Sequence, residues 1–334
     1  MTIGELIQQQ GLTFQVFDMG RRVQLLANEV FAAFEAQLSP YPSPYLKHAW
    51  LAVLAWHPEQ LAQQQIWFLK LPLDEQNKLE ASARDAFLRT VVEQLANAEQ
   101  AAKDAPFTYK PDAMRMAYFH ALALKQLQQP STDYYQRVQQ YLSGDGGFEN
   151  WQSLGVQGLA EFVVRLDEAQ NAAHFARALQ RVPLIVRNTL FGFLENQNPS
   201  ASLSQVIFTL FEQDRTQERQ VEDLAAFVRA LSHSTNLALR QRFLHEVLQH
   251  PLALEVELLA AIESRCWQDL HGKALHLFLE NLAANSQGQV VFNTLAVDLL
   301  AMPGIRGQFL QLLTSPACST TLKSSFNALL ASLR

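Results

Sequence analysis

The stretch PYLKHAWLAVLAW, Pro44–Trp56, decides how the N-terminal part of this chain is interpreted. Its last eight residues, Ala49 to Trp56, are all apolar and follow a polar entry. A helix that is apolar on every side is a buried helix. Pro44 suits the first turn of a helix, because its missing N–H costs nothing there. We therefore predict a buried central helix over this stretch.

Two segments with the character of β-strands lie on either side of it, Thr13–Asp18 and Ile66–Leu71. In the first, apolar Phe14 and Val16 alternate with polar residues, which gives the period of two expected of a strand. About fifty residues separate the segments, so a parallel pair joined by a helical crossover fits the spacing. Two strands alone are marginal. We therefore expect dimeric pairing, a third strand, or helices over both faces.

Trp67 lies in the second of these strands, where Trp67, Leu69 and Leu71 alternate with Ile66, Phe68 and Lys70. One face of the strand is therefore wholly apolar, and the other carries a single charge. Aromatic side chains bury large areas, so we predict that the tryptophans around this module, Trp50, Trp56 and Trp67, belong to its core. A cage that binds a ligand is the alternative.

From Asp74 to the C-terminus the sequence predicts only helices. The glycine cluster Ser143–Gly147 interrupts the helical pattern, and we place a domain boundary there, between residues 1–146 and 147–334. Beyond it the predicted helices are 155–166, 169–180, 183–195, 200–213, 219–232, 235–249, 251–263, 268–284, 287–300, 303–314 and 317–332.

Successive pairs of these helices begin 28 to 36 residues apart. Helix pairs at such a period are typical of an α-solenoid. The predicted fold is therefore mostly α, a small N-terminal α/β module with two short strands followed by a HEAT-like solenoid of antiparallel helix pairs.

Composition and charge indicate an ordinary folded protein, with 49% hydrophobic and 17% charged residues. Residues 1–150 hold 12 basic and 16 acidic side chains, and the rest 14 and 16, so we expect no nucleic-acid binding. Cys266 and Cys318 alone suggest neither a disulfide framework nor a thiolate metal site. The N-terminus does not resemble a signal peptide, and no apolar run is long enough to insert in a membrane. We predict a cytoplasmic protein.

The common catalytic motifs GxxxxGK[ST], GxGxxG, GxSxG and HExxH are absent from the sequence. The nine histidines include no pair four residues apart, so no helix offers two of them to a metal. We therefore assign no catalytic residue, metal site or cofactor, although missing motifs do not exclude an enzyme.

The first candidate binding residues are Arg21 and Arg22, at the start of a helical pattern that runs from Val23 to Leu38. Cations at a helix N-terminus oppose the helix dipole, so another group should offset them. Asp18 could pair with one arginine. Alternatively the two arginines bind an anion or an acidic partner, with Lys47, His48 and Lys70 as neighbours. Both interpretations stay open.

The second candidate set is Arg177 and Arg181, which share a helix face in the predicted solenoid. Arginine is favoured where a planar group pairs with carboxylates, so these residues are candidates for partner binding. Asp167, Glu168 and Glu195 lie close in sequence, and solvated ion pairs are the alternative.

Four runs carry a resemblance to a known family: FDMGRR (Phe17–Arg22), YPSPYLKHAWLAVLAW (Tyr41–Trp56), IWFLKLPLDEQ (Ile66–Gln76) and WQSLGVQGLA (Trp151–Ala160). Together they resemble a gammaproteobacterial family of about this length, domain-of-unknown-function family 3549. The resemblance implies a bacterial, cytoplasmic protein. It implies no activity and no binding residues.

These observations favour a non-enzymatic interaction or scaffold protein that binds a protein partner through an extended helical-repeat surface. The alternative is an enzyme or a binder of small anionic ligands, with its site near Arg21, Arg22, Lys47, His48 and Lys70. A homodimer stays open.

Overall fold

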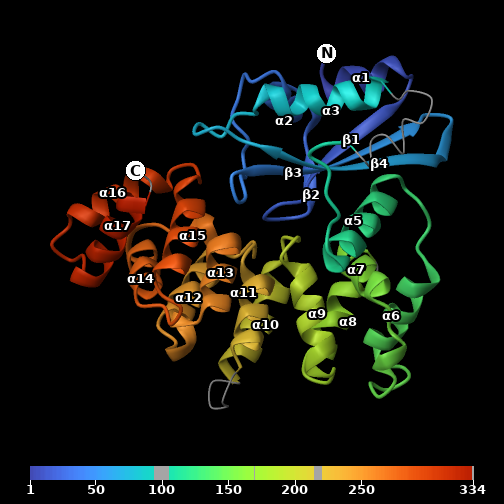
Figure 1. The fold of residues 1–334 in the computed structure, drawn as a ribbon. Coiled ribbons are helices and arrows are strands. Elements are labelled where there is room, and N and C mark those ends of the chain that lie inside the picture. The colour runs from blue at the N-terminus through green and yellow to red at the C-terminus, as the bar shows by residue number, and fades with distance from the viewer. Residues whose placement is uncertain (94–104, 169, 214–219, 333–334) are drawn as a thin grey trace. The chain divides into compact units, whose positions relative to one another are not determined.

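The computed structural model of the chain describes residues 1–93, 105–168, 170–213 and 220–332 (Figure 1). The chain divides into two compact units, Met1–Phe119 and His120–Arg334. The division falls within helix α5, Ala113–Gln126. The glycine cluster at 143–147 lies inside the second unit, and the boundary after residue 146 stays a prediction about independent folding.

The first unit is built on a four-stranded antiparallel sheet with the order β2-β1-β3-β4. Val53 in β3 is paired with Val16 of β1 on one side and Trp67 of β4 on the other. The elements of the unit are α1 Ile3–Gln9, β1 Thr13–Asp18, β2 Gln24–Leu26, α2 Asn28–Glu35, β3 His48–His57, β4 Gln60–Pro72 and α3 Ala81–Glu93.

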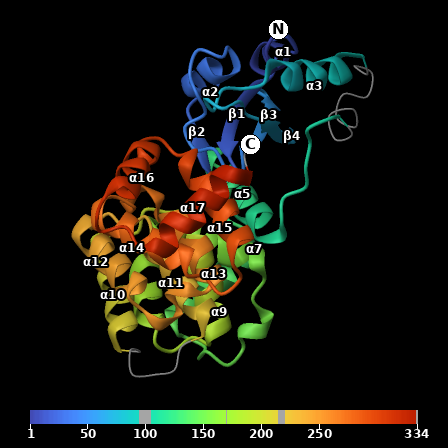
Figure 2. The same ribbon diagram turned by 60° about the vertical axis from the view of Figure 1, so that its left-hand side comes forward.

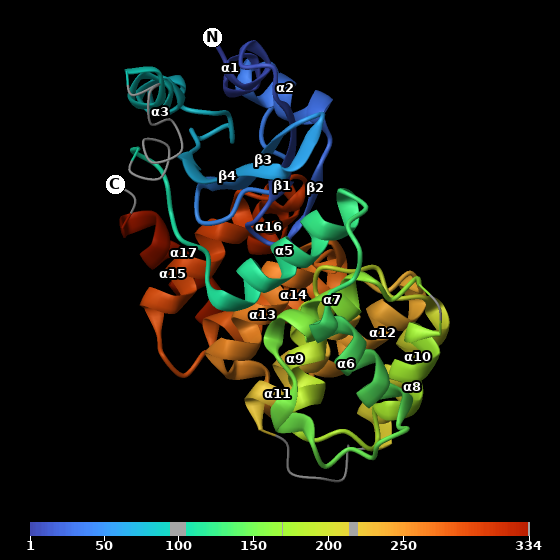
Figure 3. The same cartoon turned by 90° about the vertical axis from the view of Figure 1, so that its right-hand side faces the viewer.

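Helices α1, α2 and α3 cover one face of this sheet (Figures 1 and 3). Alternate residues of the strands, among them Val16, Val53 and Trp67, form one buried cluster with the apolar sides of the three helices. On the opposite face Phe119 of α5 packs edge to face against Phe17 and Phe68. Both faces of the central strands are therefore covered.

The predicted central helix over Pro44–Trp56 is wrong, because this stretch forms the central strand β3. Its residues from Leu51 to Ala55 are all buried. A strand covered on both faces must be apolar at every position, so it loses the period of two that marks a half-exposed strand. A short apolar run of this kind cannot be distinguished from a buried helix by periodicity.

The two predicted strands exist, but they do not form a parallel pair. Thr13–Asp18 is β1, and Ile66–Leu71 is part of the longer β4. Strand β3 lies between them and pairs antiparallel with each. The module has four strands instead of two, and the missing third strand of the prediction is the segment that was interpreted as a helix. The helical pattern from Val23 likewise begins with β2 before α2 starts at Asn28.

The N-terminus of α1 is fixed by two acidic side chains. Thr2 and Glu5 form a capping box, in which each side chain bonds to the backbone N–H of the other residue. The buried Glu35 carboxylate accepts bonds from the N–H groups of Ile3 at 2.7 Å and Gly4 at 3.2 Å. Burial raises the pKa of Glu35 despite these bonds. Glu35 therefore ties the end of α2 to the start of α1.

In its described part the second unit contains helices and the loops between them, and each of the predicted helices beyond residue 147 has an α-helical counterpart. The predicted helices 251–263 and 268–284 differ at their starts, where short 3-10 helices, Pro251–Leu254 and Trp267–Asp269, come before α13 and α14. The predicted starts at residues 169 and 219 lie outside the described residues. The α-helices that follow α5 are α6 Asp133–Ser143, α7 Val156–Val164, α8 Asn171–Ala178, α9 Leu184–Leu194, α10 Ala201–Gln213, α11 Val221–Leu231, α12 Leu237–Leu248, α13 Val256–Cys266, α14 Gly272–Ala283, α15 Gln289–Leu300, α16 Ile305–Thr314 and α17 Thr320–Ser332.

These helices pack in two rows (Figure 2). Odd-numbered helices from α7 to α17 contact one another in succession, and even-numbered helices from α6 to α16 do the same. The odd-numbered helices begin at residues 156, 184, 221, 256, 289 and 320, which lie 28 to 37 residues apart. This spacing agrees with the predicted repeat, whereas the assignment to a HEAT-like solenoid stays a prediction.

Arginine and carboxylate side chains link helices one or two repeats apart. Arg187 of α9 contacts Asp223 of α11 at 2.6 Å. Arg240 of α12 contacts Asp269, beyond α13, at 2.5 Å. Arg265 of α13 donates two bonds to Glu195, at 2.8 and 3.0 Å. The paired arginines of the second unit therefore serve its internal packing.

Two further results concern the described residues as a whole. None of their helices combines the length and the apolar character that crossing a bilayer requires. Nor does the described part of the chain gather three His, Cys, Asp or Glu side chains in an arrangement that could hold a metal ion.

Candidate functional site

The candidate site lies where β1 ends, at Asp18. Its carboxylate is buried and accepts bonds from the Gly20 N–H at 2.8 Å and from the Ser43 hydroxyl. A Cβ on Gly20 would lie 3.2 Å from the Asp18 Oδ1 and 3.3 Å from the Tyr45 Cβ, so a larger residue there would crowd the turn. Burial raises the pKa of Asp18, and these hydrogen bonds and the charge of Arg21 oppose the rise.

Arg21 holds the segment before β3 in place. Its side chain is only 2% exposed, and its Nε donates to the Pro44 carbonyl at 2.9 Å. Its guanidinium carbon lies 5.5 Å from the centre of the Tyr45 ring. Because Asp18 binds Ser43 while Arg21 binds Pro44, the two charged residues jointly fix this loop. Arg21 is therefore a support of the site, and its burial keeps it from reaching a ligand.

Tyr41 lies on the same loop with its hydroxyl group buried near Asp18. Burial first, and then the negative charge of Asp18, raise the pKa of Tyr41 well above its ordinary value. The centre of its ring lies 5.1 Å from the centre of the Phe34 ring in α2. Tyr41 thus anchors the loop as a neutral phenol.

Beside this anchor lies a half-buried group that we call the cation–aromatic surface: Tyr45, Trp50, Lys70, Tyr109 and Arg115. The Trp50 indole N–H donates to the Tyr45 carbonyl at 2.8 Å, and its ring meets Tyr109 at right angles with 4.8 Å between the ring centres. Lys70 is the cross-strand partner of Trp50, and its Nζ lies 4.5 Å from the centre of the indole.

The cations of this surface differ in how they are held. Arg115 lies 5.8 Å from the Tyr45 ring, donates to the Met19 carbonyl at 2.7 Å and is 3.4 Å from Asp112. Within the described ranges Lys70 has no carboxylate partner. A lysine held over tryptophan without a counter-charge keeps its ability to pair with an incoming anion.

The structure brings Arg21, His48 and Lys70 together, since the His48 ring lies 6.1 Å from Trp50. Lys47 is the neighbouring residue, with an exposed side chain and a carbonyl that accepts from the Leu73 N–H at 3.0 Å. Arg22 is half-buried. Arg177 and Arg181 belong to the second unit, at α8 and just beyond it, and both are exposed.

Sequence reasoning missed Tyr45, Tyr109 and Arg115, and assigned Trp50 to the core. The contact between Trp50 and Lys70 can be predicted from the sequence only if the two segments that hold them are paired as neighbouring strands. Once Pro44–Trp56 is interpreted as a helix, the cross-strand contact between Trp50 and Lys70 cannot be predicted. Tyr109 and Arg115 come from a distant part of the chain that carries no motif.

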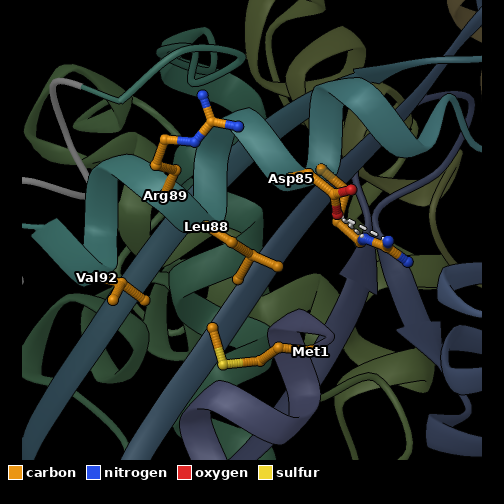
Figure 4. Close-up of a pocket in the computed structure, with 6 residues that line it drawn as sticks. Met1, Asp85, Leu88, Arg89 and Val92 are labelled. Atoms are coloured by element: carbon orange, nitrogen blue, oxygen red, sulfur yellow. Dashed lines mark hydrogen bonds and ion pairs between the residues drawn. The ribbon is translucent and has the colours of Figure 1, made fainter.

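A separate pocket of about 340 Å³ lies between the N-terminus and α3 (Figure 4). Met1, Leu88 and Val92 form its apolar wall, and Arg89 points away from them in the figure. Arg84, which also lines it, pairs with the adjacent Asp85 and donates to the Glu35 carbonyl. The pocket therefore offers little polar chemistry.

In the second unit His276, Glu280 and Ser319 lie close together but do not form a catalytic triad. Glu280 contacts the His276 Nε2 at 3.1 Å and accepts a bond from the Ser319 hydroxyl. Burial raises the pKa of Glu280, but its hydrogen bonds to Ser319 and His276 outweigh this and lower it overall. A serine nucleophile needs the histidine as its own neighbour. Here the Glu280 carboxylate contacts both His276 and Ser319, and the Ser319 hydroxyl caps α17 by accepting a bond from the Leu322 N–H.

Comparison with known proteins gives one match. A family model described as "Protein of unknown function (DUF3549)" matches residues 1–330. No curated protein matches the chain, and no solved structure does either. The predicted family is confirmed, whereas a bacterial source and a cytoplasmic location stay predictions.

Proposed function

We propose that this chain, which belongs to the DUF3549 family of proteins of unknown function, is a non-enzymatic interaction protein that binds an acidic segment of a partner protein. The observation that carries the proposal is the position of Lys70, whose ammonium group lies 4.5 Å from the centre of the Trp50 ring without a described carboxylate partner.

The composition of the cation–aromatic surface supports this type of partner. Tryptophan, tyrosine and arginine are enriched among the residues that carry most of the binding energy at protein interfaces. Trp50, Tyr45 and Arg115 supply all three types, and their contacts hold them in fixed positions. Rigid aromatic groups lose little conformational entropy on binding.

The charge of the surface favours an acidic segment. Lys70, Arg115 and exposed Lys47 contribute cations, and His48 adds a group that can be protonated. Two acidic residues of known position lie near them: Asp112, which is 3.4 Å from Arg115, and the buried Asp18, which is bonded to Gly20 and Ser43. A carboxylate from a partner would therefore meet positive charge with Lys70 as the available counter-ion.

The second unit supports a scaffold role in a different way. Helical repeats present extended surfaces to other proteins. Arg187, Arg240 and Arg265 are engaged in pairs within the unit. On this proposal the helical unit offers a separate interaction surface of its own, while the specific acidic contact is made in the first unit.

Site-directed photo-crosslinking tests the proposal. A photoreactive residue at exposed Leu46 should capture a partner peptide rich in Asp or Glu, and Lys70→Met should abolish that capture. The matched control carries the photoreactive residue at Arg137, an exposed position on α6. Crosslinks at Leu46 that persist unchanged in Lys70→Met would contradict the proposal. Saturable binding of a small anion without any crosslinked protein would favour the alternative of a small-ligand binder.

A further inference from the structure

We infer that the second unit contains a separate binding site for a small polyhydroxylated molecule that carries one phosphate or carboxylate group. The site is a groove of about 360 Å³ between α6 and α8, which we call the glutamine groove. Its walls include Gln136, Gln139, Gln140, Ser143, Gln170 and His174. This inference is independent of the proposed function, because it concerns other residues in another unit.

The helical repeat explains how these side chains share one groove. Gln136, Gln139 or Gln140, and Ser143 recur at three- to four-residue spacing on one flank of α6. Gln170 and His174 are four residues apart at the start of α8. Each amide both donates and accepts hydrogen bonds, as a hydroxyl group does. A ligand rich in hydroxyl groups is therefore the chemical match for these walls.

A buried polar network fixes one of these amides in position. The Gln139 side-chain nitrogen donates to the Tyr135 hydroxyl at 2.9 Å and to the Asn171 Oδ1 at 3.0 Å. Asn171 is fully buried and donates to Tyr135 and to the Arg165 carbonyl. Both hydrogens of the Gln139 amide are thus used, and its carbonyl oxygen has no partner among the described residues. This leaves a preoriented acceptor for a ligand hydroxyl group.

His174 supplies a second feature that points to a ligand. Its Nδ1 is buried and has no hydrogen-bond partner within the part of the chain that the structure describes. An unsatisfied buried polar atom costs free energy. His174 also lines the groove, and an imidazole ring can donate or accept a hydrogen bond with a ligand hydroxyl group.

The charges around the groove define the acidic group of the ligand. Arg177 lies three residues after His174 on α8, and Arg181 lies in the turn beyond α8. A Cβ on Gly144, between the groove residues Ser143 and Asp145, would be 3.9 Å from the Arg181 Nη1. Neither arginine has an ion-pair partner in the described ranges. Arg181 lies over the Phe148 ring, with 4.7 Å from the guanidinium carbon to the ring centre. The exposed Asp145 also lines the groove and disfavours a ligand with several negative charges. These residues together therefore favour a ligand with one anionic group.

Isothermal titration calorimetry on the full chain tests this inference with four probes: glucose 6-phosphate, gluconate, glucose and inorganic phosphate. Both anionic sugars should bind more tightly than glucose or phosphate alone. Arg181→Gln should weaken glucose 6-phosphate binding about tenfold, the loss expected for one charge-assisted hydrogen bond, and leave glucose unchanged. Gln139→Leu should weaken the binding of both glucose 6-phosphate and glucose.

The control is Arg137→Gln, which removes an exposed arginine from another side of α6 and should leave all four affinities unchanged. Circular dichroism confirms that each variant is folded. The inference is overturned if no probe binds at millimolar concentration, if phosphate alone binds as tightly as glucose 6-phosphate, or if Gln139→Leu and Arg181→Gln both bind like the unmodified chain.

Discussion

The two units of this protein treat buried carboxylates in opposite ways. In the helical unit the buried Asp223 and Asp269 and the partly buried Glu195 each contact an arginine from another helix at 2.5 to 2.8 Å. In the sheet unit Asp18 and Glu35 are bonded mainly to backbone N–H groups and a serine hydroxyl, and burial raises the pKa of both. Arginine pairing is the main contact of these three carboxylates, whereas hydrogen bonds from backbone N–H and hydroxyl groups are the main contacts of Asp18 and Glu35.

This difference bears on which cations are available to bind an acidic ligand. A paired arginine joins helices, and breaking the pair costs stability. Among the described residues Lys70 in the sheet unit lies against an aromatic ring and contacts no carboxylate, so an incoming acid can pair with it without displacing a described partner. The sheet unit therefore offers a cation for an acidic segment of a partner protein, separately from Arg177 and Arg181 beside the glutamine groove of the helical unit.

Trp67→Ala should produce the largest effect and separate the two units. Trp67 is 3% exposed and packs against Phe87 of α3, with 5.8 Å between ring centres. Truncating a buried tryptophan typically costs about 3–5 kcal/mol, a large share of the roughly 5–15 kcal/mol that stabilise a domain. Hydrogen exchange should show lost protection in residues 10–75 and unchanged protection beyond residue 147. Equal loss in both units would show that they unfold together.

Arg240→Met should destabilise the helical unit by about 2–3 kcal/mol, because it leaves the buried carboxylate of Asp269 without its partner. This cost is smaller than that of breaking a fully buried pair, since the Arg240 side chain is 19% exposed. In the double variant Arg240→Met/Asp269→Leu no charge is left unpaired, so most of the stability should return. Urea unfolding followed by circular dichroism measures both. A double variant as unstable as the sum of the single changes would contradict a pairing role.

The units should also respond to pH with opposite signs. The raised pKa values of Asp18 and Glu35 mean that the folded sheet unit binds protons more readily than the unfolded chain. Their contribution is complete below the ordinary values of 3.8 and 4.5, and is lost as pH rises through the folded-state pKa values. The lowered pKa of Glu280 gives the helical unit a contribution that is present above 4.5 and lost on acidification.

Pulse hydrogen exchange in urea, read separately for residues 10–75 and 272–332, measures this difference. The double variant Asp18→Asn/Glu35→Gln should remove the pH dependence of the first segment and leave that of the second. A sheet unit whose stability rises with pH in the unmodified chain would show that Asp18 and Glu35 do not control it.

The same contrast explains what could be predicted from the sequence. Helices such as α10, α12 and α14 bury one side, so the helical period of their apolar residues predicts their positions. Strand β3 is buried on both faces, and its apolar run lacks any period that distinguishes strand from helix. Because this segment is assigned to a helix, the sheet topology cannot be predicted. The contact between Trp50 and Lys70 cannot be predicted either, for the same reason.

The candidate site was predicted in part for the same reason. Arg21 and Lys70 were identified from charge and position, and the structure places both near Tyr45 and Trp50. The burial of Arg21 could not be predicted, because it depends on the Pro44 carbonyl and the turn at Gly20. Contacts between distant segments, such as Arg115 with Met19, leave no periodic signal in the sequence.

Lys70→Met should have the smallest effect on folding. The Lys70 side chain is only partly buried and makes no described ion pair, so its loss should change the free energy of unfolding by less than about 1 kcal/mol. Thermal unfolding of the variant checks this. A larger loss would mean that Lys70 serves the stability of the sheet unit instead of binding.

On the proposed function, Lys70 on the Trp50 ring is the counter-ion for an acidic partner. Fluorescence anisotropy of a labelled hexaglutamate peptide, titrated with the unmodified chain and with Lys70→Met, tests it most directly, with Lys78→Met as the control for an unrelated lysine. The account predicts that Lys70→Met weakens binding about tenfold, the loss of one charge-assisted contact. Binding should also weaken with added salt. Equal affinity of the unmodified chain and Lys70→Met for this peptide, or no binding of the peptide at low salt, would contradict the account.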